Sequence, residues 1–306
     1  MSDLRVSEIL RENGLDFTIE KLPMVAPRNF TSVDEGGNII DDVEMVSTPY
    51  FGLYNSKTGE IINTVKKGYT VSQNEDIVRL VLEGMSKFGE LSVSKAGSLD
   101  GGRRVFMQLG IDGLSTVGND KVKRYVTVLD SNDGSASLSV GIGDFTMSCS
   151  NQFYYFKKNA KNRMQHSASL TEKMKMIPQL IEESLEMSMI MTDKYREMYE
   201  REVSNDDAHK LVEHLVGISR LSSVDTLSEV STRSYNAMEK LYEMIRVEMA
   251  QKGENAWGLH SGVTRWTTHE KSAPRRDNGR IESMMVGTNY KTNQKSLNFV
   301  SELVGL

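Results

Sequence analysis

The chain has 306 residues, a net charge of -5 at pH 7, 38% hydrophobic residues and 26% charged residues. This composition is typical of a globular chain and excludes a disordered one. No apolar run approaches the roughly 18 residues that a membrane-spanning helix needs. The single cysteine, Cys149, excludes an internal disulfide and favours a reducing compartment, so we expect a cytoplasmic protein with no membrane partner.

Residues 1–48 predict an irregular acidic N-terminal arm. They hold ten acidic and four basic residues, with a Gly-Gly turn among acids in "DEGGNIIDDVE". Pro23 and Pro27 prevent a long helix. A short helix is expected near Val6–Asn13.

Residues 49–160 predict an antiparallel β-sheet domain. Apolar and polar residues alternate in "RRVFMQLGI" and "ASLSVGIG", and "KRYVTVL" is rich in β-branched residues. The turn signals "SLDGG", "VGND" and "SNDG" separate these runs, which is typical of an antiparallel meander. Asn74–Phe88 has helical spacing instead, so we expect one helix to pack on the sheet.

Residues 161–306 predict a helical region with a basic loop, packed on the sheet. Ser169 and Glu172 have the spacing of a capping box, and Pro178 requires the next helix to begin late or to kink. "SNDD" at 204–207 predicts a second helix start, Gly253 a helix end, and "SLNFVSELVGL" a last short helix. The fold class is therefore α+β, a β-meander with a packed helix followed by a mainly helical C-terminal half.

Sequence signatures of catalysis are absent. The chain has no Gly-rich phosphate loop, nucleophile elbow or His-Glu-x-x-His motif. Cys149 has two interpretations, a nucleophile beside His166 or His269 and a buried, inert thiol, and the second is favoured by its strand setting. The 18 methionines fit core filling better than a partner surface. We expect no catalytic residue, metal or cofactor, although a carboxylate metal site needs no local motif and stays open.

The segment "FYYFKKNAKNRMQH" combines four consecutive aromatic residues with four basic residues, and from Phe145 to Thr171 there is no acidic residue. Cations for phosphates beside flat rings for bases are what a single-strand binding site needs. The alternative is that alternate rings are core and the lysines are a solvated rim. Two more basic clusters could extend the site. The predicted nucleic-acid-binding residues are Tyr154, Phe156, Lys157, Lys158, Lys161, Arg163, Arg103, Arg104, Lys123, Arg124, Arg275, Arg276 and Arg280.

Three motifs carry a resemblance to a family. "DSNDGSASLSVGIGDFTMSCSNQF", "RMQHSASL" and "WGLHSGVTRWTTHE", in this order, resemble an uncharacterised phage/plasmid-like protein family. The sequence departs from that family at "HSG", residues 260–262. More remotely, a meander followed by a helix is similar to the core of phage single-strand annealing recombinases, which implies ATP-independent DNA pairing by a homo-oligomer in a host bacterial cell.

These observations lead to one hypothesis and two rivals. We expect a phage- or plasmid-encoded protein that binds single-stranded DNA and assists recombination or replication. In this hypothesis the lysines and arginines hold the phosphates of the DNA. The ring of Tyr154 or Phe156 faces outward and stacks on the nucleobases. One rival is a metal-dependent, nuclease-like enzyme that uses His166, His269 and an acid not visible in the sequence. The other is a structural or protein-binding phage factor that uses the Met-rich helices.

Overall fold

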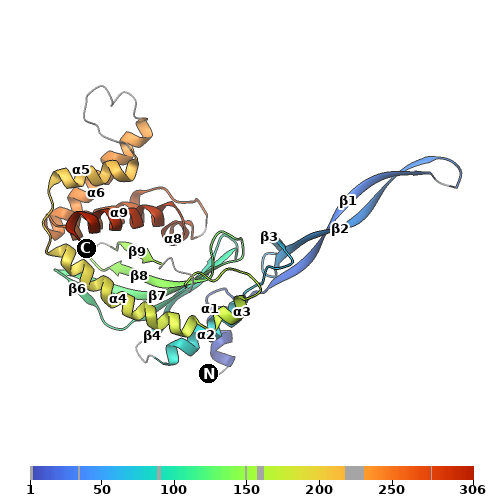
Figure 1. Cartoon of the computed structure of the whole chain (residues 1–306), viewed down its shortest axis with the longest axis horizontal. Helices are drawn as coiled ribbons and strands as arrows, with labels where there is room; N and C mark the ends of the chain where they lie inside the picture. The colour runs from blue at the N-terminus through green and yellow to red at the C-terminus, as the bar shows by residue number, and fades with distance from the viewer. Residues whose placement is uncertain are drawn as a thin grey trace.

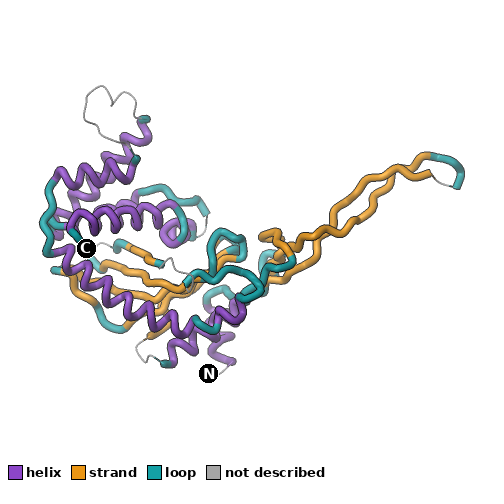
Figure 2. The backbone as a smooth tube through the Cα atoms, viewed as in Figure 1, coloured by secondary structure: helices purple, strands orange, loops and turns teal. Residues whose placement is uncertain are grey.

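The computed structural model describes residues 3–33, 35–87, 91–148, 150–156, 162–217, 231–276 and 278–306. Figures 1 and 2 show two separate sheets followed by helices, which confirms the α+β class. No described helix combines the length and apolarity that crossing a bilayer requires.

The N-terminal strands form sheet A, whose outer part is a two-stranded arm that extends away from the rest of the molecule (Figure 1). Helix α1 precedes the sheet, as expected. The elements are α1 (Asp3–Glu12), β1 (Ile19–Val33), β2 (Ile39–Asn55) and β3 (Glu60–Lys66). The prediction of an irregular arm is wrong, because residues 25–33 and 39–47, on the two sides of the Gly-Gly turn, pair in antiparallel register.

The prolines did not prevent this hairpin. β3 pairs with β2 only from Tyr50 to Asn55, so both strands are edges beyond that point. An edge strand tolerates proline, because a missing N–H that faces outward removes no ladder hydrogen bond. The register shifts between Pro23 and Val25, where the two-stranded arm begins.

Sheet B is the predicted antiparallel meander. Its path is β4-β5-β7-β8-β9, with β6 paired to β7. The elements are α2 (Asn74–Ser86), β4 (Leu91–Leu99), β5 (Arg104–Ile111), β6 (Ser115–Val117), β7 (Asp120–Ser131), β8 (Ser139–Thr146) and β9 (Gln152–Tyr155). The predicted helix is α2, which buries Ile77, Val81 and Met85 in the main core.

The C-terminal half is helical, as predicted. Its elements are α3 (Leu170–Met174), α4 (Ile177–Tyr199), α5 (Asn205–Val216), α6 (Thr232–Lys252), α7 (Ala256–Arg265), the π-helical turn η2 (Trp266–Glu270), α8 (Gly279–Met285) and α9 (Thr288–Val304). Helix α4 starts late, with Pro178 in its first turn. The Ser204–Asp207 capping box forms and α6 ends at Gly253, whereas Ser169 makes no side-chain cap.

Apolar packing joins the two halves. One core lies between sheet B and helices α1, α2 and α4, and a second lies among α4 to α7, α9 and the neighbouring sheet residues. Many methionines, among them Met164, Met198 and Met244, fill these cores, as expected. A buried ion cluster anchors the start of β7 to the helices: the carboxylate of Asp120 accepts from the Lys252 ammonium and, at 2.8 Å, from the Trp257 indole N–H.

Candidate nucleic-acid interface

The alternation of side chains gives sheet B two different faces. Val126 and Val128 of β7 point toward α2 and α4, and we call this side the α4 face. The residues between them lie on the opposite side, the α8 face. Strand pairing places on the α8 face Gln108 in β5, Tyr125 and Thr127 in β7, Gly143 and Phe145 in β8, and Gln152 and Tyr154 in β9.

Helix α8 covers only one end of the α8 face. Its Met284 and Met285 pack with Phe106, Leu129 and Tyr154 in a small apolar cluster. Toward the other end of the strands the side chains of Tyr125 and Phe145 are only half-buried. Sheet B therefore has one fully packed face and one that is partly open to solvent.

The open end holds a groove of about 200 Å³. Aromatic rings, amides and one exposed ammonium group contribute most of its surface. Its lining residues are Ser94, Lys95, Gln108, Tyr125, Asp144, Phe145, Gln152, Tyr154 and Ile281. Ile281 belongs to α8, so that helix forms one wall of the groove.

Tyr154 forms part of the floor and does not project outward. Its side chain is packed over Gly143, where a Cβ would lie 2.9 Å from the ring carbon Cδ1, so only glycine fits there. The Tyr154 hydroxyl accepts from Gln108 Nε2 at 3.2 Å and donates to Gln152 Oε1 at 3.3 Å. The expectation that Tyr154 faces solvent is wrong, because the residue is only 5% exposed, and burial raises its pKa to about 12.

Two lysines lie beside the rings. Lys95 is exposed on the edge strand β4 and lines the groove. Lys123, one of the predicted residues, pairs with Phe145 across the sheet, and its ammonium lies 5.6 Å from the centre of the Tyr125 ring.

Asp144, which also borders the groove, is buried. Burial raises its pKa to about 6, although its carboxylate accepts from the Tyr195 hydroxyl at 2.8 Å.

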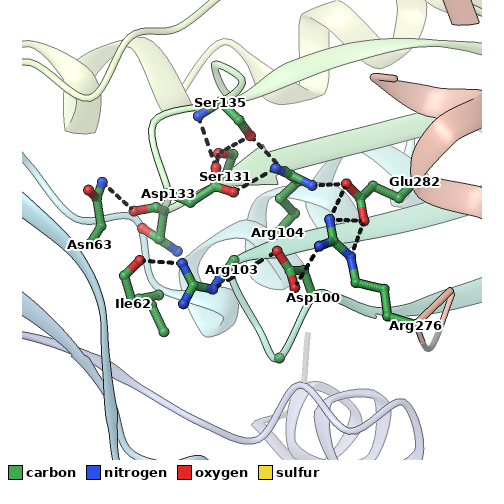
Figure 3. Close-up of polar contacts among 12 residues, drawn as sticks. Ile62, Asn63, Asp100, Arg103, Arg104, Ser131, Asp133, Ser135, Arg276 and Glu282 are labelled. Carbon is green, nitrogen blue, oxygen red and sulfur yellow. Dashed lines mark hydrogen bonds and ion pairs between the residues drawn. The ribbon is translucent and has the colours of Figure 1, made fainter. Parts of the chain in front are cut away.

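Two predicted basic clusters meet at the covered end of the α8 face (Figure 3). The Arg104 guanidinium pairs with Asp133 at 2.7 Å and with Glu282 of α8. Arg276 donates to the same Glu282 at 2.7 Å and lies 3.3 Å from Asp100. Carboxylates already neutralise Arg104 and Arg276, so they are poorly suited to hold phosphates, and they fix α8 to the sheet instead.

Three other predicted arginines are engaged with the protein itself. Arg103 donates to the Ile62 carbonyl at 3.0 Å (Figure 3). Arg124 donates to the Ser188 carbonyl of α4 at 2.6 Å, and Arg280 to the Thr268 carbonyl at 2.9 Å. The first contact links the β4–β5 turn to β3, the second links β7 to α4, and the third links α8 to η2.

The remaining predicted residues have mixed positions. Arg163 and Arg275 are exposed. Phe156 is half-buried, with its ring centre 6.1 Å from that of Tyr290. Lys157, Lys158, Lys161 and Cys149 lie outside the described residues. Sequence reasoning missed Lys95, Tyr125 and Phe145, although the period-two pattern of "KRYVTVL" signals that Lys123 and Tyr125 share a face.

His166 has an acidic partner, Asp130 at the end of β7. Its Nε2 lies 3.0 Å from Asp130 Oδ1, and its Nδ1 lies 3.0 Å from the Thr70 carbonyl oxygen. Both ring nitrogens therefore face acceptors, which requires both to carry a proton. Burial opposes the charged form, but the bonds to Asp130 and Thr70 outweigh it and raise the pKa of His166.

The surroundings of His166 favour a structural role. The Tyr69 ring stacks on it with 4.8 Å between ring centres, an arrangement that stabilises a cation. Ser72 donates to the other oxygen of Asp130, so Asp130 lies between the serine and the histidine. An imidazolium with both nitrogens occupied cannot accept a proton from a serine, and this order differs from a catalytic triad. Within the described residues, no group of three or more His, Cys, Asp or Glu side chains is placed to hold a metal.

A larger concavity, of about 840 Å³, runs along α6. Its charged lining residues are Glu239, Lys240, Glu243, Arg246 and Glu254. Acids outnumber bases there, so the potential does not favour a polyanion.

We predict that Arg104→Ala lowers the free energy of unfolding by about 3 kcal/mol, because it removes one partner from a buried ion pair. The matched change Arg276→Ala should cost about 1 kcal/mol, because its side chain is 41% exposed. Urea unfolding of both variants measures the difference. Equal losses would contradict the assignment of Arg104 as the anchor of α8.

A second prediction concerns the pH dependence of stability. Because the folded-state pKa of His166 is raised above the unfolded value of about 6.5, its contribution is complete below that value and is lost as pH rises through the folded-state pKa. The stability gap between the wild type and His166→Gln should therefore narrow as pH rises above about 6.5. Thermal unfolding of both proteins across this range measures the gap, and a gap that widens would contradict the charged state.

Neither the curated proteins nor the solved structures contain a significant match to the chain. Residues 61–296 match the family described as "Domain of unknown function (DUF932)". The matched range includes sheet B and the groove, and it excludes the two-stranded arm. Since the match covers well over half of its length, the chain belongs to the DUF932 family.

Proposed function

We propose that the chain binds single-stranded DNA on the open end of the α8 face. The observation that supports this most is the groove itself, in which half-buried aromatic rings lie beside lysines on a sheet face that α8 covers at one end only, as far as the structure describes the chain. Bases stack on such rings whatever their sequence, and ammonium groups neutralise the phosphates between them. A duplex would keep its bases stacked inside, so the rings favour a single strand.

Each group then has a role. Tyr125 and Phe145 would stack with bases, because they are the rings that remain partly accessible. Lys95 on β4 and Lys123 on β7 would contact phosphates from two strands of the sheet that have β5 between them. Tyr154 would serve as a fixed floor, held by Gln108 and Gln152. Of the site predicted from sequence, Lys123 and Tyr154 thus remain in the proposal with Tyr154 in a new role.

The biological setting rests on the sequence resemblance. A phage- or plasmid-encoded protein that assists recombination or replication, by annealing strands without ATP, would need this kind of site. Binding that ignores base sequence suits such a role, because any two complementary strands must be accepted.

The test is fluorescence anisotropy with labelled single-stranded oligonucleotides over a range of salt concentrations. Tyr125→Ala with Phe145→Ala should weaken binding at every salt concentration by about 1–3 kcal/mol per stacked base without changing the salt slope. Lys95→Gln with Lys123→Gln should instead make the slope of log affinity against log salt less steep by about 1.4. This is the loss of two phosphate contacts at about 0.7 each.

Two residues far along the chain provide a matched control. Tyr235 is an exposed ring on α6, and Lys210 is an exposed lysine on α5 paired with Asp206. Tyr235→Ala with Lys210→Gln should leave binding unchanged. No binding of the wild type at low salt, an effect of the control equal to that of the groove variants, or metal-dependent cleavage of the oligonucleotide would each overturn the proposal.

A further inference from the structure

The two-stranded arm between residues 24 and 48 exposes an unusual amount of apolar surface. Val33 is 67% exposed, Ile39 76% and Met45 65%. A two-stranded hairpin is marginally stable by itself in water. An arm of this kind, extending from the body (Figure 1), gains stability when another surface covers it.

The strand register places the most exposed apolar side chains of the arm on one face. Residues directly opposite each other in an antiparallel pair lie on the same face, and successive pairs alternate. One face, which we call the valine face, carries Val25, Pro27, Val33, Ile39, Val43 and Met45, with Asp41 as its one charged residue. The other, the ion-pair face, carries Arg28 and Glu44, 3.9 Å apart, and Asp42 beside Phe30. Its apolar residues Phe30, Ile40 and Val46 are less exposed than those of the valine face.

The charge of the arm restricts what can cover it. Residues 24–48 hold five carboxylates and a single base, Arg28. This excess of negative charge repels nucleic acid and also repels a second arm. Residues 91–171 of the body hold ten bases and six acids, and Lys95, Lys121 and Arg163 are exposed there. The charge of the arm is therefore complementary to the sheet region of the body.

The arm cannot reach this region of its own chain by folding back. Strand β2 runs without interruption from the arm into sheet A, where β3 pairs with it. The nine residues from Val25 to Val33 extend about 30 Å at about 3.3 Å per residue, which is about the width of a small domain.

We propose that the arm docks on the body of a second copy of this chain, with its valine face against the partner. Such a contact joins two different surfaces, so it is head-to-tail and each copy both donates and accepts an arm. Repeated, it produces closed rings or open filaments. The proposal does not depend on nucleic-acid binding.

The first experiment changes one face of the arm at a time in the full chain. Val43→Thr with Met45→Gln alters the valine face, and Ile40→Gln with Val46→Thr makes matched changes on the ion-pair face. Sedimentation velocity without nucleic acid should show association of the wild type and of the ion-pair-face control. The valine-face variant should have at least a roughly tenfold higher dissociation constant, a loss of about 1.4 kcal/mol.

A second experiment separates head-to-tail docking from arm-to-arm pairing. The valine-face variant keeps an intact body, so it should join wild-type assemblies as an acceptor and shorten them. Arm-to-arm pairing would exclude it. Association should also weaken as salt is raised, since opposite charges meet at the contact.

Several results would overturn the proposal. One is a wild type that stays monomeric at about tens of micromolar, the concentration range of weak interfaces. Another is an equal loss of association in the two arm variants. A third is that the labelled valine-face variant does not enter wild-type assemblies. Circular dichroism of each variant shows whether the body remains folded, so that a loss of association is assigned to the arm alone. Retained DNA binding by a monomeric valine-face variant would leave the proposed function standing.

Discussion

The pairing of Arg104 with Glu282 determines how far α8 extends over sheet B. The two residues are far apart in sequence, one at the start of β5 and the other in α8, and Asp133 and Arg276 complete the cluster. Because Glu282 is held over one end of the strands, the neighbouring Ile281 becomes the wall of the groove and the other end of the face stays open. A buried pair of this kind contributes little net stability compared with apolar packing, but it specifies one arrangement of the elements.

The polar side chains at the two ends of the α8 face of sheet B have different surroundings. At the covered end, arginines meet carboxylates and hydroxyls, and their charges are neutralised within the protein. His166 and Asp130 act in the same way on the α4 face, where they join the segment around Thr70 to the end of β7. At the open end no helix among the described residues covers the rings and lysines. The arrangement suits recognition by stacking and charge better than it suits proton transfer.

Local patterns in the sequence were enough to predict much of the fold. Alternation gave the meander, helical spacing gave α2, and Ser204 and Gly253 gave two helix ends, because each depends on neighbouring residues alone. The hairpin does not follow from local patterns, because Pro23 and Pro27 predict a break, whereas an edge strand accommodates them. The candidate site was harder to predict. Whether Arg104 faces solvent or Glu282 depends on where α8, a helix distant in sequence, packs. The spacing of apolar and polar residues around Arg104 does not predict that position. Alternation predicts that Tyr154 faces outward, but both Tyr154 and Phe153 are buried, because helices cover the sheet from both sides at that edge.

The charge of the arm has a consequence for the nascent chain. The hairpin leaves the ribosome before any of sheet B, and its free strand edges and valine face are then available to any other unfolded chain. Long apolar edge strands of this kind are templates for aggregation. Carboxylates such as Asp41, Asp42 and Glu44 interrupt the apolar run of β2 and act as gatekeepers, because strands that stack in register would bring like charges together. The residues that make one arm repel another therefore also protect the chain during synthesis, before the body that can accept an arm has folded.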